Sequence, residues 1–387
     1  MKSSPALLLL ACLASAANAA EWSASPVMSW SVNHDSNRLL IEDGPASEAG
    51  NLQMDVLLKR MTGSTIFTLQ PHAGWRKYTH EASRDADNQS LQAGGVWLDD
   101  RSSISAQAAL SRDNSLNAES PENGIFLGRS LRKAKNGSLA WSHQHSDRGR
   151  IDLQASYADV QYEDERFLEF FGLRFPFQSL TSYKYPSLSV TETTQWSPRT
   201  SLQFTTYAAR LIAESGATDS DSYGARVGLV RSLSAHFGLS MSAGLSRQSV
   251  NGRNNEGYIG RIELTHKGEL DHWRLYGERS VSASGYGFLV TQDDAGLSLE
   301  HRFAPHWSIW TSLRFLQTED IIPGRRGEQR RWERADTGLG WQATRSLRLS
   351  LLGGFVRAQQ ARLASIENGW SATAAATWTP QLRRLSR

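Results

Sequence analysis

The sequence predicts an all-β protein, a transmembrane antiparallel up-and-down β-barrel of about 18 strands, with 16 strands as the alternative. Three observations lead to this fold class: apolar and polar residues alternate along most of the chain, short and long connections alternate, and tryptophans recur beside the short connections. No segment after the N-terminus reaches the roughly 18 consecutive apolar residues of a membrane helix. The mean hydropathy of −0.46 does not exclude a membrane protein, because the alternation in a barrel wall averages out its apolar face.

The alternation has the period of a β-strand. In residues 258–265, Tyr258, Ile262 and Leu264 share one face, while Arg261 and Glu263 share the other. A strand of this kind lies between an apolar and a polar environment. Segments of about ten residues with this pattern match the length of a tilted membrane strand. A soluble β-sandwich is the alternative, but its outer face would carry more charges than these uniform apolar faces do.

The connections form two classes. Eight are short, such as residues 62–64 and 304–306, and nine are long and polar, such as residues 163–184, 251–256 and 317–334. Short turns at one rim and long loops at the other are typical of outer-membrane barrels. Eight short and nine long connections join about 18 strands.

Six tryptophans lie within a few residues of a short turn or of the last strand's end. An indole ring prefers the membrane interface, where the ring leaves water and its N–H stays hydrated. We therefore expect a membrane-interface girdle; the alternative is a set of core tryptophans in a soluble β-protein. The girdle candidates are Trp97, Trp196, Trp273, Trp307, Trp341 and Trp378.

The N-terminus has the features of a cleaved signal peptide. Lys2 is followed by an apolar run with four leucines, and Ala17 and Ala19 form a small-x-small cleavage pattern. We predict a signal peptide over residues 1–19, a barrel over residues 20–380 and a basic tail over residues 381–387. The predicted location is the outer membrane of a Gram-negative cell. Cys12 is the only cysteine, so cleavage after Ala19 excludes disulfides from the mature chain.

Residues 137–144, 147–150 and 152–157 form a strand, a tight turn and a second strand, and residues 188–202 repeat this unit. With these units, the chain from residue 21 to residue 380 resembles the outer-membrane β-barrel porins associated with exopolysaccharide and exosortase systems in proteobacteria. The resemblance implies a channel-type role, either passive solute diffusion or exopolysaccharide export. The expected partners of such a barrel are outer-membrane lipid, lipopolysaccharide and the outer-membrane assembly machinery, and the resemblance adds polysaccharide. A non-conducting structural or assembly component of a polysaccharide secretion system is the alternative. Many such barrels end in an aromatic residue, whereas this chain continues past Trp378 into a basic tail.

If the apolar faces contact lipid, the alternate positions face the barrel interior. They form a wall of mixed charge, which either lines a water-filled pore or forms a constriction that orients a solute. The pore-lining candidates are Arg226, Arg261, Glu263, Arg274, Tyr276, Glu278, Glu300, Arg302 and Arg314.

A second group of candidates lies in the predicted long connection of residues 317–334. Arginines beside an aromatic ring could bind acidic sugars or lipopolysaccharide phosphates, and the alternative is a solvated loop. The extracellular loop binding candidates are Arg325, Arg326, Arg330, Arg331, Trp332 and Arg334.

No motif predicts an enzyme, so an outer-membrane enzyme is the less favoured alternative. The sequence lacks G-x-S-x-G, H-E-x-x-H and Walker patterns, and we expect no catalytic residue, no cofactor and no metal site. His143 and His145 have metal-ligand spacing, but the predicted register turns both toward lipid or the rim. A net charge of +3 on an exported barrel argues against nucleic acid as a partner.

Overall fold

The chain forms a closed antiparallel barrel of 18 strands, which confirms the predicted fold class and strand number. The computed structural model describes residues 20–384, except residues 38–39, 41–44, 80–84, 115–129, 164–166, 171–172, 177–179, 215–218, 322–328, 360–365 and 381–382. The predicted signal peptide, residues 1–19, lies outside the described residues. Among the residues described, no helix is long and apolar enough to cross a membrane.

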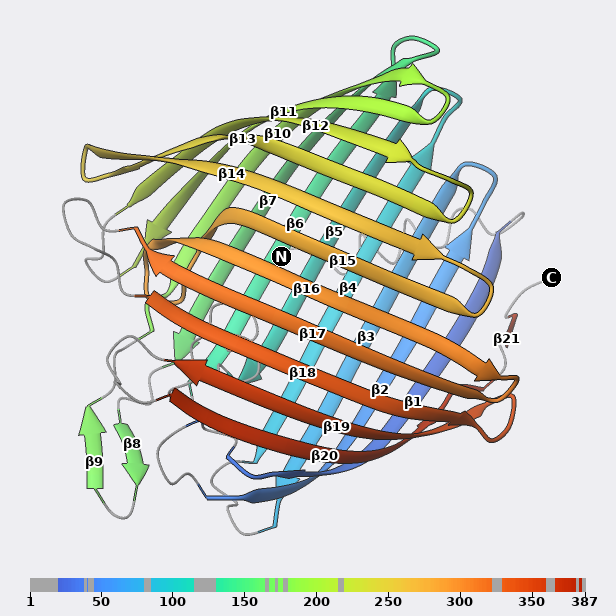
Figure 1. Cartoon of the computed structure of the whole chain (residues 1–387), viewed down its shortest axis with the longest axis vertical. Helices are drawn as coiled ribbons and strands as arrows, with labels where there is room; N and C mark the ends of the chain where they lie inside the picture. Colours follow the sequence, from blue (N-terminus) through green and yellow to red (C-terminus); the bar gives the residue numbers. More distant parts are fainter. Residues whose placement is uncertain are drawn as a thin grey trace, which may run out of the picture.

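The strands follow one another around the barrel in chain order (Figure 1). The barrel strands are β1 (Glu21–Asp35), β2 (Ser47–Met61), β3 (Thr65–Tyr78), β4 (Ala86–Leu98), β5 (Ser102–Asn114), β6 (Leu131–Gln144), β7 (Gly149–Glu163), β10 (Tyr183–Ser197), β11 (Thr200–Ala213), β12 (Ser220–Ser232), β13 (Phe237–Val250), β14 (Arg253–Lys267), β15 (Asp271–Ala283), β16 (Leu289–Ala304), β17 (Trp307–Asp320), β18 (Gln329–Gln342), β19 (Leu347–Gln359) and β20 (Ile366–Trp378).

The barrel closes where the first strand meets the last. β1 pairs with β20 from Met28 opposite Trp378 to Asp35 opposite Ser371. The first residues of β1 instead pair with β21 (Arg383–Arg384), a short strand in the predicted basic tail. Two further strands, β8 (Phe167–Phe170) and β9 (Leu173–Pro176), form a hairpin of their own between β7 and β10.

The packed residues identify the inner face of the wall. Ala134 of β6, Val160 of β7 and Leu211 of β11 are buried in one cluster with Leu289, which begins β16. Because β16 lies across the barrel from β6 and β7, these residues can meet only through the interior (Figure 1). The side chains at alternate positions from them therefore face outward.

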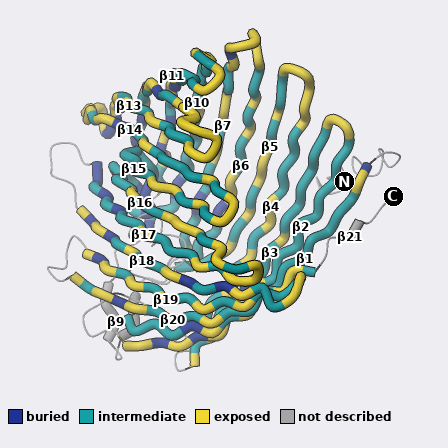
Figure 2. The backbone as a smooth tube through the Cα atoms, turned by 45° about the vertical axis from the view of Figure 1, so that its right-hand side comes forward, coloured by how far each residue is buried: buried dark blue, intermediate teal, exposed yellow. Residues whose placement is uncertain are grey.

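Exposed residues recur along the strands of the wall (Figure 2). Large apolar side chains are among them, at outward positions in the strand register. Leu245 is 73% exposed, Val32 66% and Leu351 62%. On a water-soluble protein, apolar exposure that continues around a whole wall would be a liability, whereas in a bilayer it is the lipid-contacting surface.

The two rims differ as the sequence predicted, with one exception. The connection predicted as a long loop over residues 251–256 is a two-residue turn, because β14 already begins at Arg253. Asn251 and Gly252 both have positive φ, at 51° and 72°. This is the geometry of a tight hairpin turn, for which Asn-Gly is the preferred pair.

The tip of the β15–β16 hairpin leaves the wall and enters the barrel. β15 pairs with β14 only as far as Arg279 opposite Gly260, yet it pairs with β16 up to Ala283 opposite Leu289 (Figure 1). At the tip, the Gly285 carbonyl accepts a hydrogen bond of 2.7 Å from the Thr181 N–H, which ties the tip to the segment before β10. Its apolar residues join the buried cluster on the far wall, so the tip fills part of the interior near the long-loop rim.

Candidate solute pathway in the barrel interior

All nine pore-lining candidates lie at inward positions in the strand register. Those from Arg261 to Arg314 occupy neighbouring positions on β14 to β17, and Arg226 lies on β12 opposite Thr205. Their placement agrees with the alternation seen in the sequence. Their role in lining an open pore stays a prediction.

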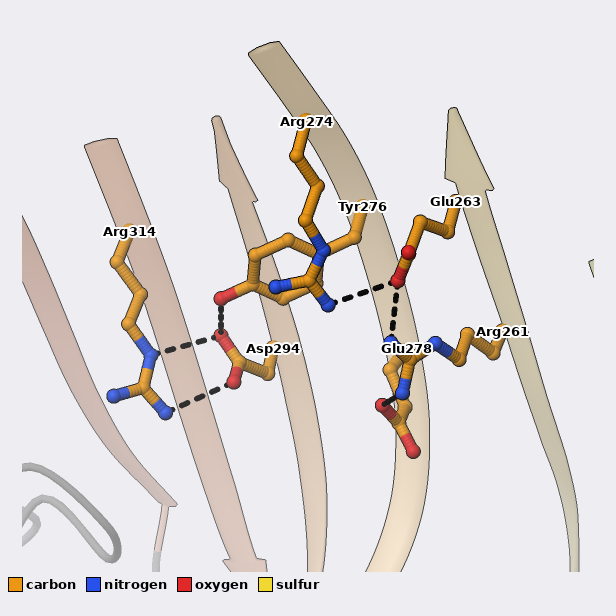
Figure 3. Close-up of polar contacts among 7 residues, drawn as sticks. All are labelled: Arg261, Glu263, Arg274, Tyr276, Glu278, Asp294 and Arg314. Atoms are coloured by element: carbon orange, nitrogen blue, oxygen red, sulfur yellow. Dashed lines mark hydrogen bonds and ion pairs between the residues drawn. The ribbon is translucent and has the colours of Figure 1, made fainter. Parts of the chain in front are cut away.

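Four of these side chains form one ion-pair network (Figure 3). Arg261 donates to Glu278 at 3.0 Å and also to Glu263. Arg274 donates to the same Glu263 carboxylate at 2.8 Å. Each carboxylate therefore has at least one guanidinium partner inside the wall, and cross-strand opposite charges of this kind stabilise the sheet.

A second cluster lies beside the first (Figure 3). Asp294 accepts two hydrogen bonds from Arg314, at 3.1 and 2.9 Å, and a third from the Tyr276 hydroxyl at 3.1 Å. Arg314 also lies over the ring of Trp332, 5.7 Å from its centroid. The sequence analysis did not predict a role for Asp294. It lies an even number of residues before the inward candidate Glu300 on the same alternating strand, so it faces inward as well.

The wall formed by β3 to β7 has a different chemistry. Its inward amides Gln92, Gln107 and Asn136 are exposed to the interior. They border a cavity of about 340 Å³ that also contacts Gln70 and Tyr185. Water therefore reaches the wall at mid-height, and no carboxylate or basic group lines this cavity.

The inward-folded tip is anchored by a buried ion pair. Arg330 and Asp320 form two hydrogen bonds of 2.7 and 2.9 Å, and their side chains are only 6% and 2% exposed. Tyr286, in the connection between β15 and β16, lies under the Arg330 guanidinium at 4.6 Å. The guanidinium thus links the last residue of β17 to the tip.

This arrangement corrects the placement of part of the second candidate group. Arg330, Arg331, Trp332 and Arg334 lie in strand β18, not in a loop. Arg330, Trp332 and Arg334 face inward, and Arg331 faces outward. The dense charge suggested a loop because β18 extends beyond the apolar belt, where both of its faces are polar. Arg325 and Arg326 lie outside the described residues.

Basic side chains without a carboxylate partner gather on the inner face near the short-turn rim. Lys267 ends β14, and Lys59, Arg302 and Arg348 lie one or two residues from the turn-side ends of their strands. None of the four forms an ion pair within the part of the chain that the structure describes. Glu300 is the inward acidic residue near them on β16 and also has no ion pair.

The six girdle candidates lie at the turn-side ends of their strands. Five of them are 37% to 73% exposed, and Trp273 is partly covered by Phe237 and His266. Trp307 and Trp341 stack with their ring centroids 5.8 Å apart. This placement is compatible with an interfacial girdle, which stays a prediction.

The two histidines with metal-ligand spacing do not converge on a site. His143 stacks on Trp141 and contacts Ser102, whereas His145 pairs with Glu192. In the described part of the chain, no group of three or more His, Cys, Asp or Glu side chains is placed to hold a metal ion.

Comparisons with known proteins support the fold. No protein-family model matches the chain, and no curated protein matches it. Among solved structures, Pseudomonas aeruginosa OccK7 (OpdD) has a TM-score of 0.50 at 14% identity, covering 96% of this chain and 100% of OccK7. The P. aeruginosa outer membrane protein OpdK has a TM-score of 0.48 at 11% identity, covering 93% of this chain and 99% of OpdK. At 14% identity, the likeness to OccK7 shows a shared barrel architecture and no more.

Proposed function

We propose that the protein is an outer-membrane channel for small polar solutes. The observation that carries the proposal is the contrast between the two faces of one closed wall. The outer face is apolar and suits lipid, while the inner face has water-exposed amides such as Gln92 and Gln107. A barrel that held no water would not leave these amides exposed without hydrogen-bond partners.

Planar-bilayer recording of the refolded full chain tests this proposal. We expect stepwise current increases in salt solution when single barrels insert. A chain that inserts, with the strand content of a barrel by circular dichroism, but gives no current would support the non-conducting structural role instead.

We further propose that the channel prefers anions. The basic residues Lys267, Arg302 and Arg348, which form no ion pair within the described residues, lie near the turn-side mouth of the barrel. In the ion-pair network of Figure 3, by contrast, two arginines and two glutamates neutralise one another. Unpaired charge at the mouth of a water-filled passage raises the local concentration of counter-ions.

Replacing Lys267 and Arg302 together by glutamine is expected to lower the chloride-to-potassium permeability ratio, roughly twofold, by removing two positive charges from the mouth. The reversal potential in a salt gradient measures this ratio. Arg112→Gln is the matched control, because Arg112 is an exposed outward residue at the long-loop rim. An unchanged ratio in the double variant would refute the proposed anion preference.

Exopolysaccharide export is a narrower proposal that rests on the resemblance alone. The hairpin tip in the barrel interior argues against polymer export, because a polymer chain would have to pass or displace the tip. A small solute needs a narrower passage than a polymer chain does, so we favour solute diffusion.

A further inference from the structure

The amide-bearing part of the wall is built from two adjacent rows of inward side chains. The strand register places Gln70 opposite Gln92 and Asn136 two strands beyond. In the next row, Gln107 lies opposite Gly94 on one side and Ser138 on the other. The long amides are thus gathered over four neighbouring strands, β3 to β6.

Small residues between the amides hollow out the wall. Ala109 separates Gln92 from Asn136 in the first row, and Gly94 precedes Gln107 in the second. A Cβ at Gly94 would lie only 2.9 Å from the Thr68 hydroxyl, so a side chain at this position would crowd Thr68. The result is the cavity of about 340 Å³, a volume within the range of small-molecule sites.

The amides have free hydrogen-bonding capacity. Within the described residues, the side chains of Gln70, Gln92, Gln107 and Asn136 make no hydrogen bond or ion pair. The Thr68 hydroxyl, in contrast, donates to the Gly94 carbonyl at 3.5 Å. Each carboxamide offers two donors and one acceptor oxygen. Four of them together present donors and acceptors side by side.

This pattern matches hydroxyl groups better than charged groups. A hydroxyl both donates and accepts, whereas a carboxylate only accepts and an ammonium only donates. No unpaired charge lines the cavity, and the charged cluster of Arg261, Glu263 and Arg274 across the barrel is neutralised internally. An ionic solute would lose hydration here without gaining a counter-charge.

We propose that this cavity, bordered by Gln70, Gln92, Gln107 and Asn136, is a binding subsite for neutral, hydroxyl-rich solutes of the carbohydrate class. The subsite names the solute class of the channel and in that respect rests on the proposed function. The cavity lies further from the long-loop rim than the hairpin tip does, next to the wall on which the tip packs. A solute that passes the tip therefore meets these amides.

Calorimetric titration of the detergent-purified full chain with maltotetraose tests the subsite without requiring any current. We expect saturable binding. Poly(ethylene glycol) of similar size, which has ether acceptors and no internal donors, is expected not to bind measurably.

The variant carrying Gln92→Met, Gln107→Met and Asn136→Leu keeps the side-chain volumes and removes the amide donors and acceptors. We expect it to bind maltotetraose roughly 10- to 100-fold more weakly, as for the loss of two or three hydrogen bonds. Gln89→Met is the matched control, because Gln89 is on β4 but faces outward. Equal binding by the triple variant and the wild type, or no binding by the wild type, overturns the subsite.

The two proposals fail separately. A conducting barrel that does not bind maltotetraose refutes the subsite and leaves the channel intact. A barrel that binds the sugar through these amides but conducts no ions refutes the channel and leaves the subsite intact. Should the triple variant not fold, Gln107→Met alone carries the test, with an expected loss of about fivefold.

Discussion

Removing the tip of the β15–β16 hairpin is expected to raise the single-channel conductance severalfold. The variant lacks residues 282–290 and joins the shortened strands through Asn-Gly, the pair that already forms the tight turn between β13 and β14. In the intact chain, Leu289 is fully buried in the interior against Leu211 and Val160. Its removal opens the cross-section that these groups now fill.

The deletion should widen the passage and remove little of the wall. β14 and β15 pair only up to Arg279 opposite Gly260, so that ladder stays intact, and the ladder between β16 and β17 loses only the pair of Val290 and Asp320. Circular dichroism of the variant is expected to show the strand content of the wild type. An unchanged conductance in a folded variant would show that the tip does not limit the passage.

Replacing Asp320 by asparagine is expected to produce a large loss of folding stability. Arg330 then keeps its charge in a site where its side chain is 6% exposed, without the carboxylate that it contacts at 2.7 and 2.9 Å. Removing one partner of a buried ion pair costs about 3–5 kcal/mol. Thermal unfolding in detergent measures the loss.

The same substitution should loosen the hairpin tip. Tyr286 packs against the Arg330 guanidinium, so a displaced Arg330 removes one support of the tip. We expect larger current fluctuations in the open channel than in the wild type.

An exposed ion pair provides the control for this substitution. Lys133 and Glu163 pair at the long-loop rim with side chains 44% and 56% exposed, and Glu163→Gln is expected to change stability by less than about 1 kcal/mol. The double variant Asp320→Leu with Arg330→Met removes both charges, and it should recover much of the lost stability. If the Asp320→Asn variant unfolds at the same temperature as the Glu163→Gln variant, the pair of Asp320 and Arg330 does not anchor the hairpin tip.

Much of the fold could be predicted from the sequence, because alternate residues of a membrane-barrel strand face lipid and the aqueous interior and therefore differ in polarity. Alternation such as that from Tyr258 to Leu264 predicted the wall, and the eight short and nine long connections predicted its strand number. The same alternation placed Arg261 and Glu263 on one face, where the structure pairs them.

The errors have a common physical cause, which is that strands continue above the lipid. There the outer face is polar too, so Arg330 to Arg334 lost the alternating signal and were assigned to a loop. Residues 251–256 were assigned to a loop for the same reason, although Asn251-Gly252 is a strong hairpin signal.

The inward hairpin tip and the amide cavity could not be predicted from local sequence patterns, because both depend on tertiary structure. Nothing in residues 280–291 distinguishes a hairpin that enters the barrel from one that continues the wall. The amide cavity also depends on register, because Gln92, Gln107 and Asn136 lie far apart in the sequence and meet only when β4, β5 and β6 are aligned.

Cysteine labelling along β5 tests the central claim, that one face of each strand contacts lipid and the other encloses water. Cys12 is the only cysteine in the sequence, so a Cys12→Ser background allows single cysteines at Ala106, Gln107 and Ala108 to be compared. In lipid vesicles, a charged, water-soluble thiol reagent is expected to label position 107 and to leave 106 and 108 unlabelled, since Gln107 faces inward and the two alanines face outward. Equal labelling at all three positions, or labelling of the alanine positions alone, would contradict the account.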